Sequence, residues 1–153
     1  MLGRAVGLHH RTGRTCALVL LDVDHFKAVN DRLGHDGGDD VLRRIAATVQ
    51  RLRRGTDAFA RIGGEEFAVL LDDTDAEGGE QFARRLRRTL LEDGPSAGRH
   101  VTVSAGVSTV GRWVDAAATL AAADRALYAA KSGGRNCVRS FEASKSPGLR
   151  AAA

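Results

Sequence analysis

The sequence has few cysteines, few aromatic residues and no long apolar run, and each shortage excludes a class of protein. Two cysteines in 153 residues are too few for a disulfide-stapled fold, and the spacing of Cys16 and Cys137 fits neither a metal site nor a redox pair. No apolar stretch approaches the roughly 20 residues that cross a bilayer, and no signal peptide is recognisable. At 5% aromatic residues, a base-stacking surface is not indicated. We expect a cytoplasmic protein without direct membrane contact or a nucleic-acid partner, although a longer parent protein could be membrane-tethered.

Lysine is also scarce. Of 23 basic residues, only Lys27, Lys131 and Lys145 are lysine. A lysine that persists in an arginine-rich chain is a candidate for a position that needs a compact point charge, although composition bias alone also leaves a few lysines. The net charge of +4 permits a phosphate-bearing partner, but the basic residues are spread over several predicted helices, so charge alone selects no partner.

The remaining composition is that of one ordinary globular domain. The chain is 43% apolar and 27% charged, and 153 residues can bury roughly 70% of the unfolded surface. We expect a single domain over residues 1–140 and a disordered tail over residues 141–153.

The first half of the pattern predicts a strand and two helices. The apolar segment 15–24, which ends in acidic residues, predicts a buried central strand. Residues 26–34 predict a short helix that Gly34 ends, followed by a loop over residues 35–38, with Asp39 as the N-cap of the next helix. The apolar face of that helix has helical spacing: Val41, Ile45, Val49 and Leu52.

The second half predicts a hairpin followed by alternating helices and strands. Residues 58–62 and 65–71 predict strands joined at Gly63-Gly64, a pair that supplies the positive φ angles of a two-residue hairpin turn. The remaining elements are a helix over 75–91, a strand over 100–110, a helix over 115–131 and a strand over 136–142. This order predicts an α/β or α+β fold with one mixed sheet covered by helices.

Four acidic residues lie at the end of the first strand and at the hairpin: Asp22, Asp24, Glu65 and Glu66. A single acidic residue at a strand end is usually solvated. If these two strands pair, however, Asp22 and Glu65 become neighbours, and clustered carboxylates need a compensating cation. Carboxylates with a main-chain carbonyl are ligands that Mg²⁺ uses when it also holds phosphates.

Several other side chains are candidates for contacts with a nucleotide. Lys27 begins a helix, where free backbone amides favour an anion, and Lys131 and Arg135 surround a glycine turn that can wrap a phosphate. A surface lysine and ordinary helix-end cations explain the same residues. Asn30 and Asp39 can bind a base edge, or they are a helix residue and an N-cap.

In this order and spacing the motifs resemble one family. The segments LDVDHFKAVNDRLGHDGGDDVL, ARIGGEEFAVLL and ADRALYAAKSGGRN are similar to the catalytic domain of diguanylate cyclases, the GGDEF domain, over residues 15–138. The hairpin has the Gly-Gly-Glu-Glu-Phe form, one of two found in active members. The resemblance implies a fold like that of adenylyl cyclase and the polymerase palm: a central mixed, largely antiparallel five-stranded sheet wrapped by helices.

The resemblance also implies an activity, the condensation of two GTP molecules to cyclic di-GMP with loss of two pyrophosphates. Two Mg²⁺ or Mn²⁺ ions per active site would be held by Asp22, the main-chain carbonyl of Val23 and Glu65, with Glu66 close by. Glu65 and Lys27 are the implied catalytic residues, and Glu65 helps to deprotonate the ribose 3′-OH. Because one domain holds one GTP, the reactive species would be a two-fold homodimer.

The implied substrate site has a phosphate part and a guanine part. The phosphate part consists of Lys27, the amides near Phe26, the hairpin glycines Gly63 and Gly64, and Lys131 and Arg135. The guanine part consists of Asn30, His35 and Asp39.

An inhibitory product site is also implied. Arg54-Gly-Thr-Asp57 lies five residues before Gly63, the offset at which the family has an Arg-x-x-Asp site for cyclic di-GMP. Arg85 is an expected second clamp, from a neighbouring domain. Arg-x-x-Asp also arises by chance in an arginine-rich chain.

The start of the sequence departs from the family pattern. Members usually begin with Asp-x-Leu-Thr-Gly-Leu-x-Asn-Arg and a full helix, whereas residues 1–14 hold only the end of such a helix. We therefore expect a truncated N-terminal helix and a regulatory domain outside this chain. The alternative function is a catalytically silent receptor for cyclic di-GMP or GTP, although such members usually have a damaged hairpin signature.

Overall fold

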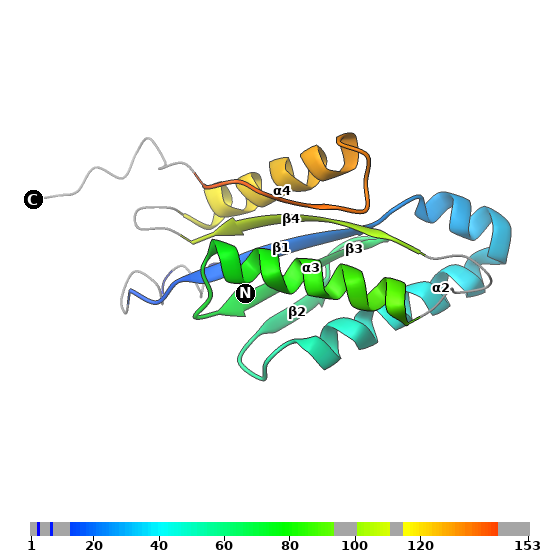
Figure 1. The fold of residues 1–153 in the computed structure, drawn as a ribbon, viewed down its shortest axis with the longest axis horizontal. Coiled ribbons are helices and arrows are strands. Elements are labelled where there is room, and N and C mark those ends of the chain that lie inside the picture. Colours follow the sequence, from blue (N-terminus) through cyan, green and yellow to red (C-terminus); the bar gives the residue numbers. More distant parts are fainter. Residues whose placement is uncertain (1–2, 4–6, 8–12, 94–100, 111–114, 144–153) are drawn as a thin grey trace, which may run out of the picture.

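The computed structural model describes residues 3, 7, 13–93, 101–110 and 115–143 (Figure 1). Its elements are β1 (Cys16–Val23), α2 (Phe26–Leu52), β2 (Ala58–Arg61), β3 (Glu66–Asp72), α3 (Ala76–Glu92), β4 (Val103–Thr109), α4 (Ala116–Ser132) and β5 (Val138–Ser140). Most of the predicted N-terminal helix end and residues 144–153 of the predicted tail lie outside the described residues.

The five strands form one mixed sheet in the order β2-β3-β1-β4-β5. The central strand β1 is antiparallel to both β3 and β4, β2 is antiparallel to β3, and β5 is parallel to β4. All eight residues of β1 are buried, as its apolar sequence predicted. The predicted fold class, a mixed and largely antiparallel five-stranded sheet with helices, is confirmed.

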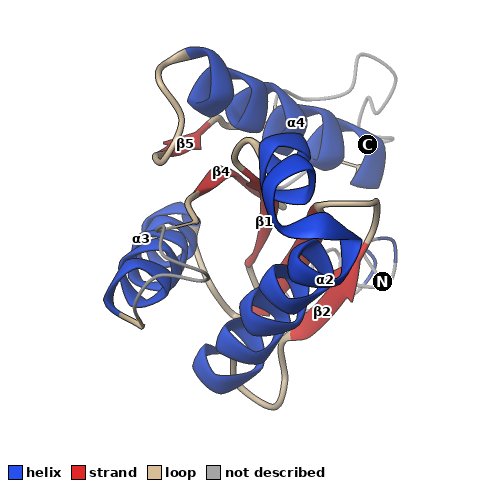
Figure 2. Ribbon diagram, turned by 90° about the vertical axis from the view of Figure 1, so that its right-hand side faces the viewer, coloured by secondary structure: helices blue, strands red, loops and turns tan. Residues whose placement is uncertain are grey.

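The helices cover both faces of the sheet. Figure 2 shows α4 on one side of the strands and α2 with α3 on the other. Alternate residues of β1 pack against the helices on opposite sides of the sheet, because successive strand residues point to opposite faces. Val19 and Leu21 pack in the large core with α2 and α3, whereas Leu18 and Leu20 pack with Ala123 and Leu127 of α4.

Helix α4 lies unusually close to β4 because of one glycine. A Cβ at Gly106 would lie 2.1 Å from the carbonyl oxygen of Ala123 and 2.3 Å from the amide nitrogen of Leu127. These are backbone atoms that cannot rotate away, so only glycine allows this approach. The close packing fixes the C-terminal end of α4, which carries Lys131, relative to the end of β1.

The prediction of a loop over residues 35–38, between the first two predicted helices, is wrong. Gly34 leaves the helical conformation, with φ 72° and ψ 173°, but residues 35–38 are helical and Asp39 is not an N-cap. A single glycine in the left-handed region redirects the chain without a loop. Helix α2 therefore consists of two segments with a break at Gly34.

The predicted hairpin is present, but its turn type is not the predicted one. Among the described residues, the glycines with positive φ are Gly13, Gly34 and Gly134, so Gly63 and Gly64 do not form a primed two-residue turn. The Ile62 and Gly63 amides both donate to the Glu66 carbonyl oxygen, at 2.9 and 3.3 Å. The side chain of Arg61 donates to the Gly63 and Gly64 carbonyls, which stabilises a wider loop.

Candidate active site

Strand pairing brings the acidic residues of β1 and the hairpin together. Asp22 lies opposite Glu66 in the β1–β3 ladder, and the Val23 amide donates to the Glu65 carbonyl oxygen at 3.3 Å. Asp22 is 5% exposed, and both glutamates are half-buried. The predicted proximity of Asp22 and Glu65 is confirmed.

Lys131 pairs with this acidic cluster. Its ammonium nitrogen lies 2.6 Å from Oδ2 of Asp22, and its side chain is one-third exposed whereas that of Asp22 is almost fully buried. The lysine lies in the last turn of α4, where the helix dipole also favours a cation. A residue predicted to bind phosphate thus contacts a residue predicted to bind metal, so both groups belong to one site.

The cluster perturbs the ionisation of Glu65. Partial burial, followed by the charges of Asp22 and Glu66, raises the pKa of Glu65 above its ordinary value, and the charge of Lys131 opposes this shift. One lysine therefore does not fully compensate the carboxylates. A further positive charge at this position would be stabilised electrostatically.

The donor set fits a metal ion that arrives with a nucleotide. Within the described residues, no three His, Cys, Asp or Glu side chains are gathered as a metal site, so there is no closed protein cage. Mg²⁺ characteristically uses one or two protein carboxylates and completes its shell with phosphates and water. Buried Asp22 and half-buried Glu65, which carry excess negative charge, provide this partial set.

Asp24 does not belong to the acidic cluster, although the sequence placed it beside Asp22. Strand β1 ends at Val23, and the carboxylate of Asp24 accepts hydrogen bonds from Thr102 Oγ1, Ser104 Oγ and the Asn136 amide, at 2.7, 2.7 and 2.9 Å. Asp24 is 5% exposed. Its three neutral donors come from β4, from Thr102 directly before β4, and from the segment after α4.

The candidate nucleotide-binding residues of α2 lie on both sides of its break. Phe26 is buried at the start of the helix, Lys27 is exposed, and Asn30 is half-buried. Asn30 Oδ1 lies against Gly38, where a Cβ would approach it to 1.8 Å. The second segment of α2 therefore packs directly on Asn30 at Gly38, the residue before Asp39.

A cavity of about 280 Å³ lies between the second segment of α2 and the hairpin strands. It is lined by Asp39, Leu42, Arg43, Ala46, Phe59, Arg61 and Phe67. Neither Asn30 nor His35 is among these residues, and His35 is exposed. A carboxylate beside apolar walls is suited to a flat ring with N–H donors on its edge.

Lys131 and Arg135 lie on either side of the turn that ends α4. The Arg135 amide donates to the Ala130 carbonyl oxygen at 3.0 Å, and Arg135 has a left-handed backbone with φ 62°. Its side chain is exposed, whereas Lys131 faces Asp22. The structure thus confirms the glycine turn between the two cations.

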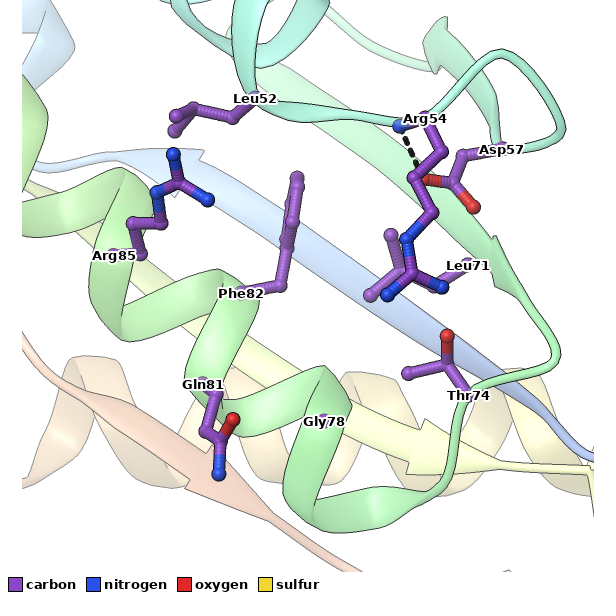
Figure 3. A pocket seen from close by; sticks show the side chains of 9 residues that line it. All are labelled: Leu52, Arg54, Asp57, Leu71, Thr74, Gly78, Gln81, Phe82 and Arg85. Carbon is purple, nitrogen blue, oxygen red and sulfur yellow. Dashed lines mark hydrogen bonds between the residues drawn. The ribbon is translucent and has the colours of Figure 1, made fainter.

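The three residues of the predicted product site line one cavity of about 240 Å³. Arg54 and Asp57 come from the segment between α2 and β2, and Arg85 comes from α3. Figure 3 shows the ring of Phe82 between the side chains of Arg54 and Arg85. The other lining residues are Leu52, Leu71, Thr74, Gly78 and Gln81.

Asp57 also has a structural role that the sequence did not reveal. Its Oδ2 accepts from the Arg54 amide at 2.7 Å and its Oδ1 from the Asp72 amide at 3.0 Å, and it is 6% exposed. The carboxylate therefore fixes the segment that presents Arg54 to the cavity. Phe82 also lines the cavity, and the sequence did not predict this. Its helical spacing with Leu86 and Leu90 indicates only that it packs in the core.

The fold and the site together define a domain of the nucleotide cyclase type, with acidic residues at the end of a central antiparallel strand pair and cations opposite. The chain belongs to the GGDEF domain family of diguanylate cyclases. The family model described as Diguanylate cyclase, GGDEF domain, matches residues 1–137.

Individual relatives agree with this assignment. The chain is 40% identical over 141 residues to diguanylate cyclase DgcP of Pseudomonas aeruginosa, covering 88% of this chain and 21% of DgcP. It spans between 21% and 35% of the length of three curated relatives that it matches.

Solved structures agree as well. The active GGEEF domain of a diguanylate cyclase from Vibrio cholerae superimposes with a TM-score of 0.85 at 32% identity, covering 95% of this chain and 93% of that chain. The GGDEF domain of DgcB from Caulobacter crescentus in complex with c-di-GMP has a TM-score of 0.85 at 34% identity, covering 91% and 85%. In the part of the chain that the structure describes, no helix is both long and apolar enough to cross a membrane.

Replacing Glu65 with glutamine should stabilise the protein at pH 7 in metal-free buffer. Because the folded state raises the pKa of Glu65, it binds this proton more tightly than the unfolded state does, and stability falls as the pH rises through the folded pKa. Glutamine stays uncharged, so Glu65→Gln should raise the thermal midpoint at pH 7. This gain in thermal midpoint should disappear below pH 4.5, the ordinary pKa of the carboxyl group.

The matched control is Glu92→Gln, at the exposed end of α3, which should show no such gain. Unfolding followed by circular dichroism at several pH values measures both variants. A midpoint for Glu65→Gln that is unchanged or lower at pH 7 would contradict the electrostatic description of the site.

Proposed function

We propose that this chain is the catalytic part of a diguanylate cyclase, which condenses two GTP molecules to cyclic di-GMP and two pyrophosphates. The observation that supports it is the convergence of Asp22, Glu65 and Lys131 at the end of the β1–β3 pair, beside an intact Gly-Gly-Glu-Glu-Phe hairpin. This site combines ligands for a metal with a cation for phosphate. GTP is a cytoplasmic nucleotide, and we place the reaction in that compartment.

Two Mg²⁺ or Mn²⁺ ions per active site fit the proposal, held by Asp22, the main-chain carbonyl of Val23 and Glu65, with Glu66 nearby. Bound with the triphosphate, such ions neutralise charge on the attacking and leaving oxygens. Partial burial and then the charges of Asp22 and Glu66 raise the pKa of Glu65, and positive ions at this position would lower the cost of keeping these carboxylates charged. Lys131 then exchanges its partner, releasing Asp22 and contacting phosphate.

The other residues hold the substrate. Lys27, the amides near Phe26, and Arg135 surround the phosphates, and the Gly63-Gly64 loop leaves space for them to approach the backbone. Asp39 and Asn30 accept and donate hydrogen bonds at the guanine edge, with His35 close to Asp39 in the sequence; Asn30 lies against Gly38, the residue before Asp39. Lys27 stabilises charge that develops on the phosphates during transfer.

The chemistry requires two copies of the domain. Glu65 accepts the proton of the ribose 3′-OH, the 3′ oxygen forms a bond to the α-phosphorus of the GTP on the other copy, and the bond from that phosphorus to the bridging oxygen of pyrophosphate breaks. The 3′-OH of that second GTP attacks the α-phosphorus of the first GTP in the same way, which releases the second pyrophosphate and closes the ring. A two-fold dimer with facing sites aligns both attacks at once.

The second cavity is suited to the product as an inhibitor. Arg54 and Arg85 supply guanidinium groups that can bind phosphate or a guanine edge in a bidentate manner, and Phe82 lies between them. Asp57 holds the segment of Arg54 through backbone hydrogen bonds and retains lone pairs for a base. A cyclic di-GMP that bridges two domains here would keep their GTP sites apart, so inhibition would be allosteric. The complex of the related DgcB domain with c-di-GMP supports this ligand.

Product analysis tests the proposed activity. Incubation of the purified chain with GTP and Mg²⁺ should yield cyclic di-GMP and pyrophosphate, identified by chromatography and mass spectrometry. Glu65→Gln should reduce the rate at least about 100-fold, because it removes both a metal ligand and the acceptor of the 3′ proton. Glu92→Gln should retain the parental rate. Binding of GTP or cyclic di-GMP without any product would contradict the proposal and favour the receptor alternative.

Product inhibition should depend on Arg54. Arg54→Ala should weaken cyclic di-GMP binding by about tenfold or more, because it removes a charged hydrogen-bond donor, while the initial rate changes little. Calorimetry with cyclic di-GMP and progress curves with added product measure the two effects. Arg84→Ala is the matched control, because Arg84 pairs with Glu80 on the same helix as Arg85 and does not line the cavity. Equal product affinity in Arg54→Ala and the parent would place the inhibitory site elsewhere.

A further inference from the structure

The segment after α4 has an unusual backbone for the residue types it contains. Three successive residues have positive φ: Gly134 at 110°, Arg135 at 62° and Asn136 at 45°. Residues other than glycine adopt this region at a cost, and two in succession persist only where surrounding contacts hold them. The conformation directly determines where Arg135 leaves the backbone.

One restraint on this segment comes from Asp24. The Asn136 amide donates to Asp24 Oδ2 at 2.9 Å, and the same buried carboxylate accepts from the hydroxyls of Thr102 and Ser104. The Asp24 amide in turn donates to the Thr102 carbonyl oxygen. A charged acceptor thus joins the end of β1 to β4 and to the Arg135–Asn136 segment, two residues beyond the candidate metal ligand Asp22.

The second restraint comes from the opposite layer of the fold. Nη1 of Arg87, on α3, donates to the main-chain oxygen of Asn136 at 3.2 Å and to its Oδ1 at 3.1 Å. Arg87 is half-buried, whereas its helix neighbours Arg84, Arg85 and Arg88 are exposed. Asp24, directly after β1, therefore binds the amide of Asn136, and Arg87 of α3 binds its two oxygens.

From these contacts we infer that Asp24, Arg87 and Asn136 are positioning residues for the phosphate site, acting through Arg135. This inference rests on the proposed binding of GTP. With both restraints in place, residues 135–136 keep their left-handed conformation. Arg135 then has a fixed position at the end of the turn that separates it from Lys131. Without the Arg87 contacts, Asn136 loses two of its hydrogen bonds, and the segment is free to relax toward ordinary backbone angles. Arg135 then contacts phosphate less often.

Arg87→Met tests this inference, with Arg88→Met as the matched control on the same helix. Arg88 pairs with Glu92, and both side chains are about two-thirds exposed, so the two variants lose the same charge. Calorimetry with the non-reacting α,β-methylene analogue of GTP should show roughly tenfold weaker binding for Arg87→Met, as expected for a displaced charge-assisted contact. Binding of GMP, which lacks the β- and γ-phosphates, should be unchanged, and Arg88→Met should match the parent with both ligands.

A double-mutant cycle shows whether Arg87 acts through Arg135. In an Arg135→Ala background, Arg87→Met should cause no further loss of analogue affinity, because the group that it positions is absent. If Arg87→Met lowers the unfolding midpoint below the assay temperature, Asn136→Ala, which removes the Oδ1 acceptor outside the core, replaces it in the same cycle.

The outcomes separate this inference from the proposed function. A parent chain that binds neither the GTP analogue nor GMP would contradict the proposed function itself. A parent that binds the analogue, together with an Arg87→Met variant that binds it equally well or loses GMP to the same extent, would overturn the positioning role alone. Additive losses in the double-mutant cycle would also overturn it.

Discussion

The antiparallel pairing of β1 with β3 is the constraint on which the candidate active site depends. Its register places Asp22 opposite Glu66 and leaves Glu65, the residue directly before β3, beside Val23. A slip of one residue would exchange the two faces of the strand, moving Val19 and Leu21 into the α4 layer and Leu18 and Leu20 into the layer of α2 and α3. The apolar core therefore fixes the register, and the register fixes the distances between the carboxylates.

The same site carries an electrostatic cost that the rest of the fold offsets. Asp22 is buried, and partial burial together with the charge of Asp22 raises the pKa of Glu65, a shift that Lys131 opposes only in part. Lys131 reaches Asp22 because α4 lies close to the sheet over Gly106. One glycine thus sets both the packing of this apolar layer and the position of Lys131 in the candidate site. Such concentrated charge is typical of sites built to bind a ligand of opposite sign rather than to stabilise the fold.

Most elements of the fold could be predicted from apolar spacing, because buried strands and amphipathic helices have distinct periods. The errors occurred where glycine allows several conformations. Gly34 redirects α2 within one residue, so residues 35–38 are helical and not a loop, and the Gly63-Gly64 pair lies in a wider turn held by Arg61. Sequence alone does not distinguish these conformations.

The acidic and basic motifs located most of the candidate site, but not the division of roles within it. Asp22 and Asp24 look equivalent in the sequence, yet β1 ends between them, so one faces Lys131 and the other binds β4 and Asn136. The contact of Arg87 with Asn136 spans 49 positions in the chain. No local pattern indicates such a contact, because it arises from the packing of α3 beside β5.

We propose that two copies of this domain, each holding one GTP, form the reactive species. The initial rate of cyclic di-GMP formation at saturating GTP and Mg²⁺, measured over a wide range of protein concentration with light scattering to follow assembly, tests it most directly. We expect the rate per chain to rise with protein concentration until all chains are in the dimer. A rate per chain that stays constant across dilution, while light scattering shows only monomer, would contradict it.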